Sequence, residues 1–136
     1  MLMSFFPRKA SFTLAAWLLV SAIANAVEAS DDAKVLMSIA SVETGGNRLA
    51  VGDNKRARGQ YQTHKASWED GNEQLMREGL KTYPWAGWKS ALAQDMIASA
   101  LLRSIRYKLK QRGINNPSVR QLALVWGCGF EKASEY

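Results

Sequence analysis

Glu43 is the residue whose type and position best suit acid and base chemistry. It follows Ile39 by four residues and Leu36 by seven, so the three side chains share one face of a helix. An apolar face partly withdraws a carboxyl group from water, and the helix's negative end lies nearby, so both effects favour the protonated form. A carboxylic acid that keeps its proton can protonate a leaving glycosidic oxygen. The alternative is an exposed polar residue at a frayed helix end.

Asp53 is the best candidate for a second carboxylate. It lies ten residues after Glu43, in the turn-forming segment Gly52-Asp53-Asn54. Two carboxylates can divide the roles of acid and nucleophile in glycoside cleavage, and their separation decides between retaining and inverting chemistry. Aspartate also favours turns for conformational reasons, so an ordinary turn residue is the alternative.

Side chains suited to holding a sugar follow at three positions. The faces of Tyr61 and Trp126 can stack on sugar rings, although burial in a core is the commoner reason for an aromatic residue. The amide of Gln62 both donates and accepts hydrogen bonds, which suits an N-acetyl or hydroxyl group. We assign Trp68 and Trp88 to the core.

The sequence contains few residues suited to metal binding or thiol chemistry. His64 is the only histidine and Cys128 the only cysteine, so the sequence offers no cluster with metal-ligand spacing and no internal disulfide. We therefore expect no metal and no other cofactor. His64 is predicted to be structural, and Cys128 is predicted to be a buried packing thiol because no adjacent histidine would activate it.

Apolar periodicity and glycine or proline signals predict the elements that position these residues. The expected elements are a helix over 30–43 stopped by Thr44-Gly45-Gly46-Asn47, a loop or short hairpin over 48–62, one or two short helices over 65–80 interrupted near Gly71-Asn72, a long helix over 89–112, and a last helix that begins at Asn116-Pro117-Ser118. The fold class is therefore mainly α of the small α+β kind, with the hairpin or loop forming one side of a cleft.

Details of the helical faces are also predicted. Val42 continues the apolar face of the first helix, and Leu92 begins that of the long helix. The basic residues towards the end of the long helix are expected to form a solvated face that complements the helix dipole. Pro117 is expected in the first turn of the last helix.

The N-terminus has the pattern of a secretory signal peptide. Arg8 and Lys9 precede an apolar run over 13–24, and Ala24-Asn25-Ala26 resembles a cleavage site. The run falls short of the roughly 20 residues that span a bilayer, and an uncleaved anchor is the alternative. Cleavage would leave about 110 residues, enough for one domain. The net charge would fall from +6 to +4, which suits an anionic polymer of the cell wall or nucleic acid equally.

Three segments together resemble the active-site segments of the lysozyme-like superfamily. They are Ile39-Ala-Ser-Val-Glu-Thr-Gly-Gly-Asn47, Ala50-Val-Gly-Asp-Asn54 with Ala57-Arg-Gly-Gln-Tyr-Gln62, and Leu122-Ala-Leu-Val-Trp-Gly-Cys-Gly129. The pattern is similar to that of bacterial lytic transglycosylases and of bacterial relatives of invertebrate-type lysozymes. In that family a helix ends at the catalytic glutamate, a Gly-x-x-Gln segment lines the cleft, and an aromatic-Asn-x-Gly segment closes it. The resemblance covers about residues 33 to 136.

The resemblance implies cleavage of the β-1,4 bond between N-acetylmuramic acid and N-acetylglucosamine in peptidoglycan. It implies Glu43 as general acid and base, with Asp53 as nucleophile or stabiliser if the chain follows the invertebrate-type lysozymes. Lytic transglycosylases manage with one glutamate and release a 1,6-anhydro product, so both chemistries stay open. The implied substrate-binding residues are Thr44, Gly59, Tyr61, Gln62 and Trp126.

The sequence departs from the family pattern in three ways. Gly127 stands where the family usually has an asparagine that contacts the substrate or the glutamate. The chain lacks the disulfides of the animal invertebrate-type enzymes. Relatives continue into another helix beyond the stretch that ends here at Tyr136, so the resemblance implies a missing C-terminal helix. These departures leave open a non-catalytic peptidoglycan-binding protein on the same scaffold.

The expected organisation is a signal peptide over 1–26 and a lysozyme-like catalytic domain over 27–136. We expect an exported monomer, periplasmic or secreted, whose partner is the glycan strand of peptidoglycan rather than nucleic acid. The activity would serve wall turnover, or local opening of the wall for a secretion or conjugation apparatus.

Overall fold

The computed structural model describes residue 22 and residues 31–133 of the chain. The expected signal peptide therefore lies outside the described residues, apart from Ala22. Within the described part, no helix has both the length and the apolar character needed to cross a membrane.

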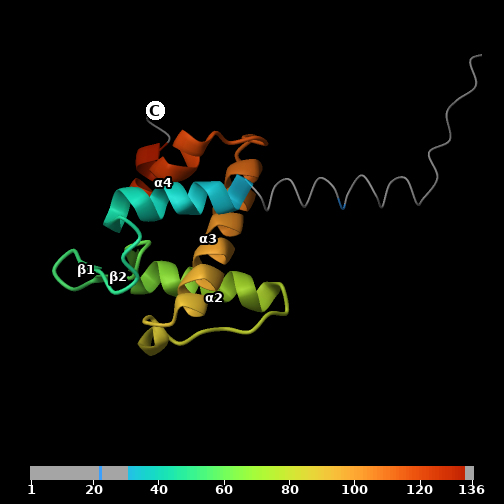
Figure 1. Ribbon diagram of the computed structural model, residues 1–136. Coiled ribbons are helices and arrows are strands. Elements are labelled where there is room, and N and C mark those ends of the chain that lie inside the picture. Colours follow the sequence, from blue (N-terminus) through green and yellow to red (C-terminus); the bar gives the residue numbers. More distant parts are fainter. Residues whose placement is uncertain (1–21, 23–30, 134–136) are drawn as a thin grey trace, which may run out of the picture. The chain divides into compact units, whose positions relative to one another are not determined.

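Helices make up most of this part of the chain, and a small antiparallel sheet accompanies them (Figure 1). The elements are a helix over residues 31–44, β1 (Val51–Gly52), β2 (Ala57–Arg58), β3 (Thr63–His64), α2 (Lys65–Arg77), the 3-10 turn η1 (Trp85–Gly87), α3 (Ala91–Gln111) and α4 (Val119–Ala133). The strand order is β1-β2-β3. The predicted fold class, mainly helical with a small β element, is confirmed.

The 31–44 helix ends where the sequence predicted. Gly45 and Gly46 have φ values of 63° and 83°, and the N–H of Gly46 donates to the carbonyl of Ala40 at 3.0 Å. Glycine adopts this left-handed conformation without the cost that a Cβ would add. Val42, in contrast, is 85% exposed, so its predicted place in the core is wrong. The last turn of the helix runs past the elements that cover its earlier turns.

The predicted hairpin is present, and a third strand extends it. β1 and β2 pair antiparallel with Val51 opposite Arg58, and β2 pairs with β3 with Ala57 opposite His64. The connecting turn places Asp53 at a φ of 44°, in the left-handed region that Asp and Asn tolerate better than most residues. β3 was not predicted, because a two-residue strand is too short to show an alternating pattern.

The predicted interruption of α2 near Gly71 is wrong. Gly71 is buried inside a continuous helix, and a Cβ placed there would lie 2.9 Å from Cγ2 of Ile97 on α3. A glycine within a helix often marks a close approach of another element rather than a break. Here it lets α2 and α3 pack closely.

α3 contributes to both hydrophobic clusters of the described chain, and its ends are set by local chemistry. The Ser90 side chain accepts a hydrogen bond from the N–H of Ala93 at the start, and Gly113 follows the end with a φ of 85°. Figure 1 shows α3 running from its start beside α2 to its end beside the 31–44 helix and α4. Leu92 is 62% exposed, so its predicted core role is wrong, because the buried face passes through Ala93 instead.

The first cluster joins the 31–44 helix, Tyr61, α3 from Ala98 onwards, and α4. Its buried members are Val35, Leu36, Ile39, Ala40, Tyr61, Ala98, Leu102, Ile105, Leu109, Leu122 and Val125. The second joins α2, the first half of α3 and the aromatic segment before it, with Trp68, Leu75, Ala93, Ile97 and Ala100 buried. The core assignment of Trp68 is confirmed, and Trp88 packs partly buried against this cluster.

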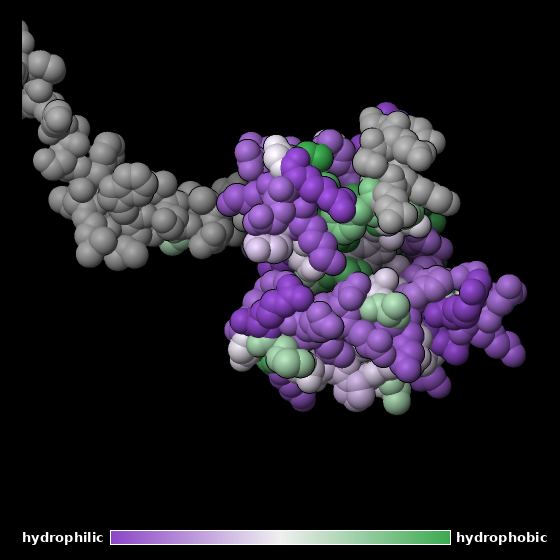
Figure 2. Space-filling model, turned by 180° about the vertical axis from the view of Figure 1, so that it is seen from behind, coloured by the Kyte–Doolittle hydropathy of each residue, from purple (hydrophilic) through white to green (hydrophobic). Residues whose placement is uncertain are grey.

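Two basic residues of α3 are not merely solvated. Nε of Arg106 donates to Oδ1 of Asp32 at 2.6 Å, and these side chains are only 17% and 12% exposed. Arg103 forms two hydrogen bonds with the carboxylate of Glu78, at 2.8 and 2.7 Å. The prediction of a wholly solvated basic face is therefore wrong. Figure 2 shows that, on the face it presents, hydrophobic residues form small patches among polar ones.

α4 begins with a reciprocal cap. The N–H of Gln121 donates to Oγ of Ser118 at 3.2 Å, and the N–H of Ser118 donates to the Gln121 side chain at 2.9 Å. Pro117 therefore precedes the cap rather than occupying the first turn. Helical geometry breaks at Gly129, with φ 78° and ψ 172°. Cys128 is exposed, so the prediction of a buried thiol is wrong.

Candidate functional site

A pocket of about 300 Å³ gathers most of the predicted site residues from separate elements. We call it the Glu43 pocket. Its lining residues are Glu43, Asp53, Ala57, Tyr61, Gln62, Thr63, His64, Ser67, Leu101, Trp126 and Gly127. The 31–44 helix, the sheet with its turns, α2, α3 and α4 thus all contribute to one cavity.

Glu43 lies in the last turn of its helix with its side chain exposed. Leu36 and Ile39 are each 6% exposed, yet the face that they share with Glu43 is no longer covered at this turn. The expectation that an apolar stripe would withdraw Glu43 from water is therefore wrong. Among the described residues, its carboxylate makes no hydrogen bond or ion pair. It is a free acidic group at the wall of the pocket.

Asp53 is both a turn residue and a pocket residue. Its Oδ1 accepts a hydrogen bond from Nη2 of Arg56 at 3.0 Å, and its Oδ2 lies 3.2 Å from Nε2 of His64. Arg56 lies in the turn before β2 and His64 lies in β3, so two separate segments hold the carboxylate in place. His64, which we predicted to be structural, contacts Asp53 and itself lines the pocket.

Part of the Gln62 side-chain amide is hydrogen-bonded to the backbone. Its Nε2 donates to the carbonyl of Gly59 at 2.9 Å, and Gln62 itself has a φ of 48°. The Gln62 side-chain oxygen lies against the backbone of Gly52, so closely that a Cβ at position 52 would collide with it. A side chain at position 52 would therefore force the Gln62 amide to move.

Tyr61 and Trp126 form an aromatic wall. Their ring centroids are 6.3 Å apart in an edge-to-face arrangement, and the indole Nε1 of Trp126 donates to the carbonyl of Tyr61 at 3.4 Å. Tyr61 is 7% exposed and donates its hydroxyl hydrogen to Oδ1 of Asp95 at 2.9 Å. Burial, followed by this hydrogen bond, raises the pKa of Tyr61 to about 12. Trp126 is half-buried and offers the accessible aromatic surface.

Thr44 and Gly59 are not among the residues that line the pocket. The Thr44 hydroxyl lies 3.0 Å from the carbonyl of Gln60, which ties the helix end to the segment after β2. Gly59 is buried with a φ of 74°, and a Cβ there would lie 2.6 Å from the Gln94 side chain. Both residues therefore hold the wall of the site in place.

Gln94 and Asp95 are positioning residues that the sequence did not reveal. Asp95 accepts two hydrogen bonds from Arg48 and one from Gln60, all at 3.1 Å, besides that of Tyr61. Gln94 is 3% exposed, and its Oε1 accepts from the N–H of Gln60 at 3.0 Å. The only sequence signal was a pair of adjacent polar residues inside the apolar periodicity of a long helix.

Two further features define what the pocket can do. Gly127 lines it, and a Cβ added there would meet nothing within 4 Å. Among residues 31–133, no group of three or more His, Cys, Asp or Glu side chains could hold a metal ion. The pocket places the carboxylates of Glu43 and Asp53 beside the amide of Gln62 and the indole of Trp126.

Comparison with protein-family models, curated proteins and solved structures finds no significant match to the chain.

Proposed function

We propose that the chain is a peptidoglycan-cleaving glycosidase of the lysozyme-like kind, with Glu43 as general acid and base. The observation that supports this most directly is the pocket itself. It gathers Glu43, Asp53, Gln62 and Trp126, which come from the three sequence segments that resemble the active site of that superfamily. The proposed bond is the β-1,4 link between N-acetylmuramic acid and N-acetylglucosamine.

The free carboxyl group of Glu43 is suited to both halves of the reaction. It first donates a proton to the bridging oxygen and then accepts one from the attacking water or muramic 6-hydroxyl. A glycan lying along Trp126 would cover Glu43 and expel water from it, so the substrate itself would supply the burial that the chain does not. This accounts for an acid that is exposed in the free protein.

Asp53 has a supporting role in this proposal. Because Arg56 and His64 fix its carboxylate, it can stabilise positive charge that develops on the sugar without having to move. Attack by water gives a reducing end, and attack by the 6-hydroxyl gives a 1,6-anhydro end that is lighter by one water. Mass analysis of the products therefore distinguishes the two chemistries.

A non-catalytic peptidoglycan-binding protein is the second candidate. The exposure of Glu43 and the glycine at position 127 favour it, because a binding protein needs neither a shielded acid nor the amide that the family places there. Such a protein would retain peptidoglycan without releasing soluble fragments.

The proposal extends to where the protein acts. The N-terminal pattern supports export to the periplasm or beyond, where the wall polymer is found. We propose a monomer that acts on glycan strands and not on nucleic acid, in wall turnover or in local opening for a secretion or conjugation apparatus.

Zymography on purified peptidoglycan tests the proposal. The wild-type chain should clear the gel and Glu43→Gln should not. Glu69→Gln is the matched control, because Glu69 is an exposed glutamate on α2 whose partner is Lys65, outside the pocket. Equal clearing by Glu43→Gln would remove Glu43 from the mechanism. Binding without clearing by the wild-type chain would favour the second candidate.

A further inference from the structure

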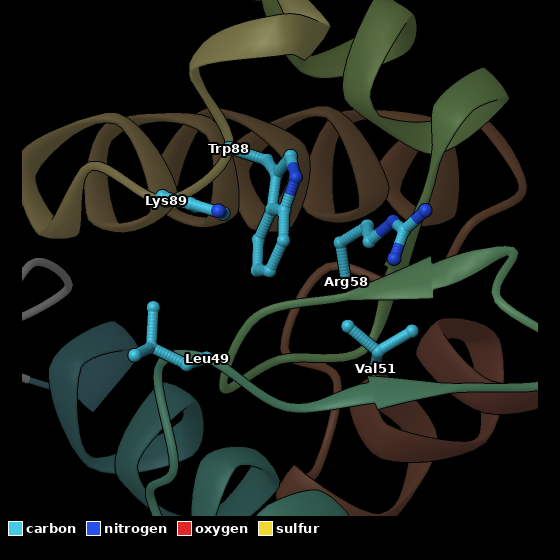
Figure 3. A pocket seen from close by; sticks show the side chains of 5 residues that line it. All are labelled: Leu49, Val51, Arg58, Trp88 and Lys89. Carbon is cyan, nitrogen blue, oxygen red and sulfur yellow. The ribbon is translucent and has the colours of Figure 1, made fainter.

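A second and larger pocket, of about 550 Å³, is lined by Leu49, Val51, Arg58, Trp88 and Lys89. We call it the Trp88 pocket. Figure 3 shows the Trp88 ring between the side chains of Lys89 and Arg58, with Leu49 and Val51 facing it across the opening. It shares no lining residue with the Glu43 pocket.

The two pockets lie on opposite faces of the hairpin. Val51 and Arg58 are paired residues of β1 and β2, so their side chains point to the same face. The next pair, Gly52 with Ala57, points to the other face, and Ala57 lines the Glu43 pocket. The Trp88 pocket is thus a separate site rather than an extension of the first.

The base of the Trp88 pocket is apolar and preformed. Leu49 and Val51 are 63% and 46% exposed, although they are among the large hydrophobic residues of the chain. Trp88 is held from its backbone, because its carbonyl accepts from Nε2 of Gln94 at 2.8 Å and its N–H donates to Trp85 at 3.0 Å. An aliphatic group entering the pocket would cover exposed apolar surface without rearranging the backbone.

The rim of the pocket carries two positive charges, those of Arg58 and Lys89. The Arg58 guanidinium lies 5.3 Å from the Trp88 ring centroid, and Nζ of Lys89 lies 5.9 Å from it. Within residues 31–133, neither cation forms an ion pair, and no acidic residue lines the pocket. Because the two cations lie beside the indole faces, a sugar ring would have to displace one of them to stack there. An aliphatic side chain that packs against Leu49, Val51 and the indole edge facing them would displace neither cation.

We propose that the Trp88 pocket binds an acidic peptide segment, taking one aliphatic side chain against Leu49, Val51 and Trp88 while neighbouring carboxylates pair with Arg58 and Lys89. This site does not depend on the glycosidase proposal, since it shares no residue with the Glu43 pocket.

Isothermal titration calorimetry of the full-length chain tests the site with four probes. The first is a capped peptide of alternating glutamate and leucine. The second replaces each glutamate with glutamine, the third replaces each leucine with glycine, and the fourth is an N-acetylglucosamine oligomer. The first peptide should bind, more weakly as salt is added, and each replacement should weaken its binding several-fold. The sugar should not compete with it.

The Arg58→Gln/Lys89→Gln double variant should bind the acidic peptide about tenfold more weakly, since each exposed ion pair contributes modestly. Lys81→Gln is the matched control, because Lys81 also lies over an aromatic ring, that of Tyr83, outside the pocket. It should bind as the wild type does. Equal binding of the neutral peptide, competition by the sugar, an unchanged double variant, or no binding of the acidic peptide would each overturn the proposal.

Discussion

Glu43 and Asp53 share a pocket but have different surroundings. Asp53 is held by Arg56 and His64, whereas Glu43 has no partner among the described side chains. Two carboxylates in unlike environments commonly take different roles in glycoside cleavage. The fixed group suits electrostatic support, and the free group suits proton transfer, which requires small movements towards the substrate.

Gly127→Asn tests whether the missing family amide limits the proposed reaction. A Cβ at this position meets nothing within 4 Å, and Gly127 lines the same pocket as Glu43, so we expect the new amide to face that pocket. We expect Gly127→Asn to fold normally and to release peptidoglycan fragments up to about tenfold faster, the effect of one hydrogen bond to a charged group. Gly127→Ala is the control without an amide. A rate for Gly127→Asn no higher than that of Gly127→Ala would show that this amide is not what limits the site.

Because of Tyr61, we expect the fold to lose stability at alkaline pH. Its pKa is raised from 10.0 to about 12, so the fold favours the neutral phenol. Its contribution is complete below pH 10 and is lost as the pH rises through 12, because only the unfolded chain ionises between these values. Urea unfolding at increasing pH should show stability falling over this range, and Tyr61→Phe should show a shallower fall. A slope that Tyr61→Phe leaves unchanged would contradict this.

At the residue scale, the sequence predicted which candidate residues share one site but not how exposed each side chain is. Glu43, Asp53, Tyr61, Gln62 and Trp126 all line the pocket. Periodicity tells which face a residue occupies, but it does not tell how far the covering elements extend along the helix. The exposure of Glu43 therefore required the tertiary structure, as did the hydrogen bonds that Tyr61 and Gln60 make to Asp95.

Two glycines within helices should respond in opposite ways to the same substitution. Gly71→Ala should destabilise the fold by about 1–2 kcal/mol, because the new methyl group would press on Ile97. Gly127→Ala should stabilise it by up to about 1 kcal/mol, because its site is open and alanine favours a helix. Chemical denaturation measures both. Stabilisation by Gly71→Ala would contradict the close packing of α2 against α3.

At the scale of elements, local sequence signals predicted where helices end. Whether a helix continues through its middle, or a short strand forms, depended on tertiary contacts. Gly45, Gly113 and Ser118 act at helix ends through their own backbone or side chain, so the sequence suffices to place them. The uninterrupted course of α2 through Gly71 depends on Ile97 in another helix. β3 depends on pairing with β2, which no local pattern reveals.

α3 holds the whole domain together because it contributes to both hydrophobic clusters. Leu102 is fully buried in the first cluster, whereas Leu92 on the same helix is 62% exposed. Leu102→Ala should cost about 3 kcal/mol of unfolding free energy, and Leu92→Ala should change it by less than about 0.5 kcal/mol. Thermal unfolding checks both. Comparable losses would mean that the buried face of α3 has been assigned to the wrong residues.

The hairpin separates two pockets of different character. One carries carboxylates and a half-buried indole, and the other carries cations around an indole and exposed aliphatic side chains. On our proposals, a glycan strand and an acidic peptide would occupy opposite faces of the same small sheet. Neither ligand would have to displace the other.

The proposed role of Glu43 is best tested with the mass spectrum of soluble fragments released from purified peptidoglycan sacculi. We predict disaccharide-containing fragments with the wild-type chain and with Glu69→Gln. With Glu43→Gln we predict release reduced at least about a hundredfold, as expected for loss of a general acid. Equal release by Glu43→Gln, or no release by a folded wild-type chain, would contradict the proposal that the chain cleaves peptidoglycan with Glu43 as its general acid.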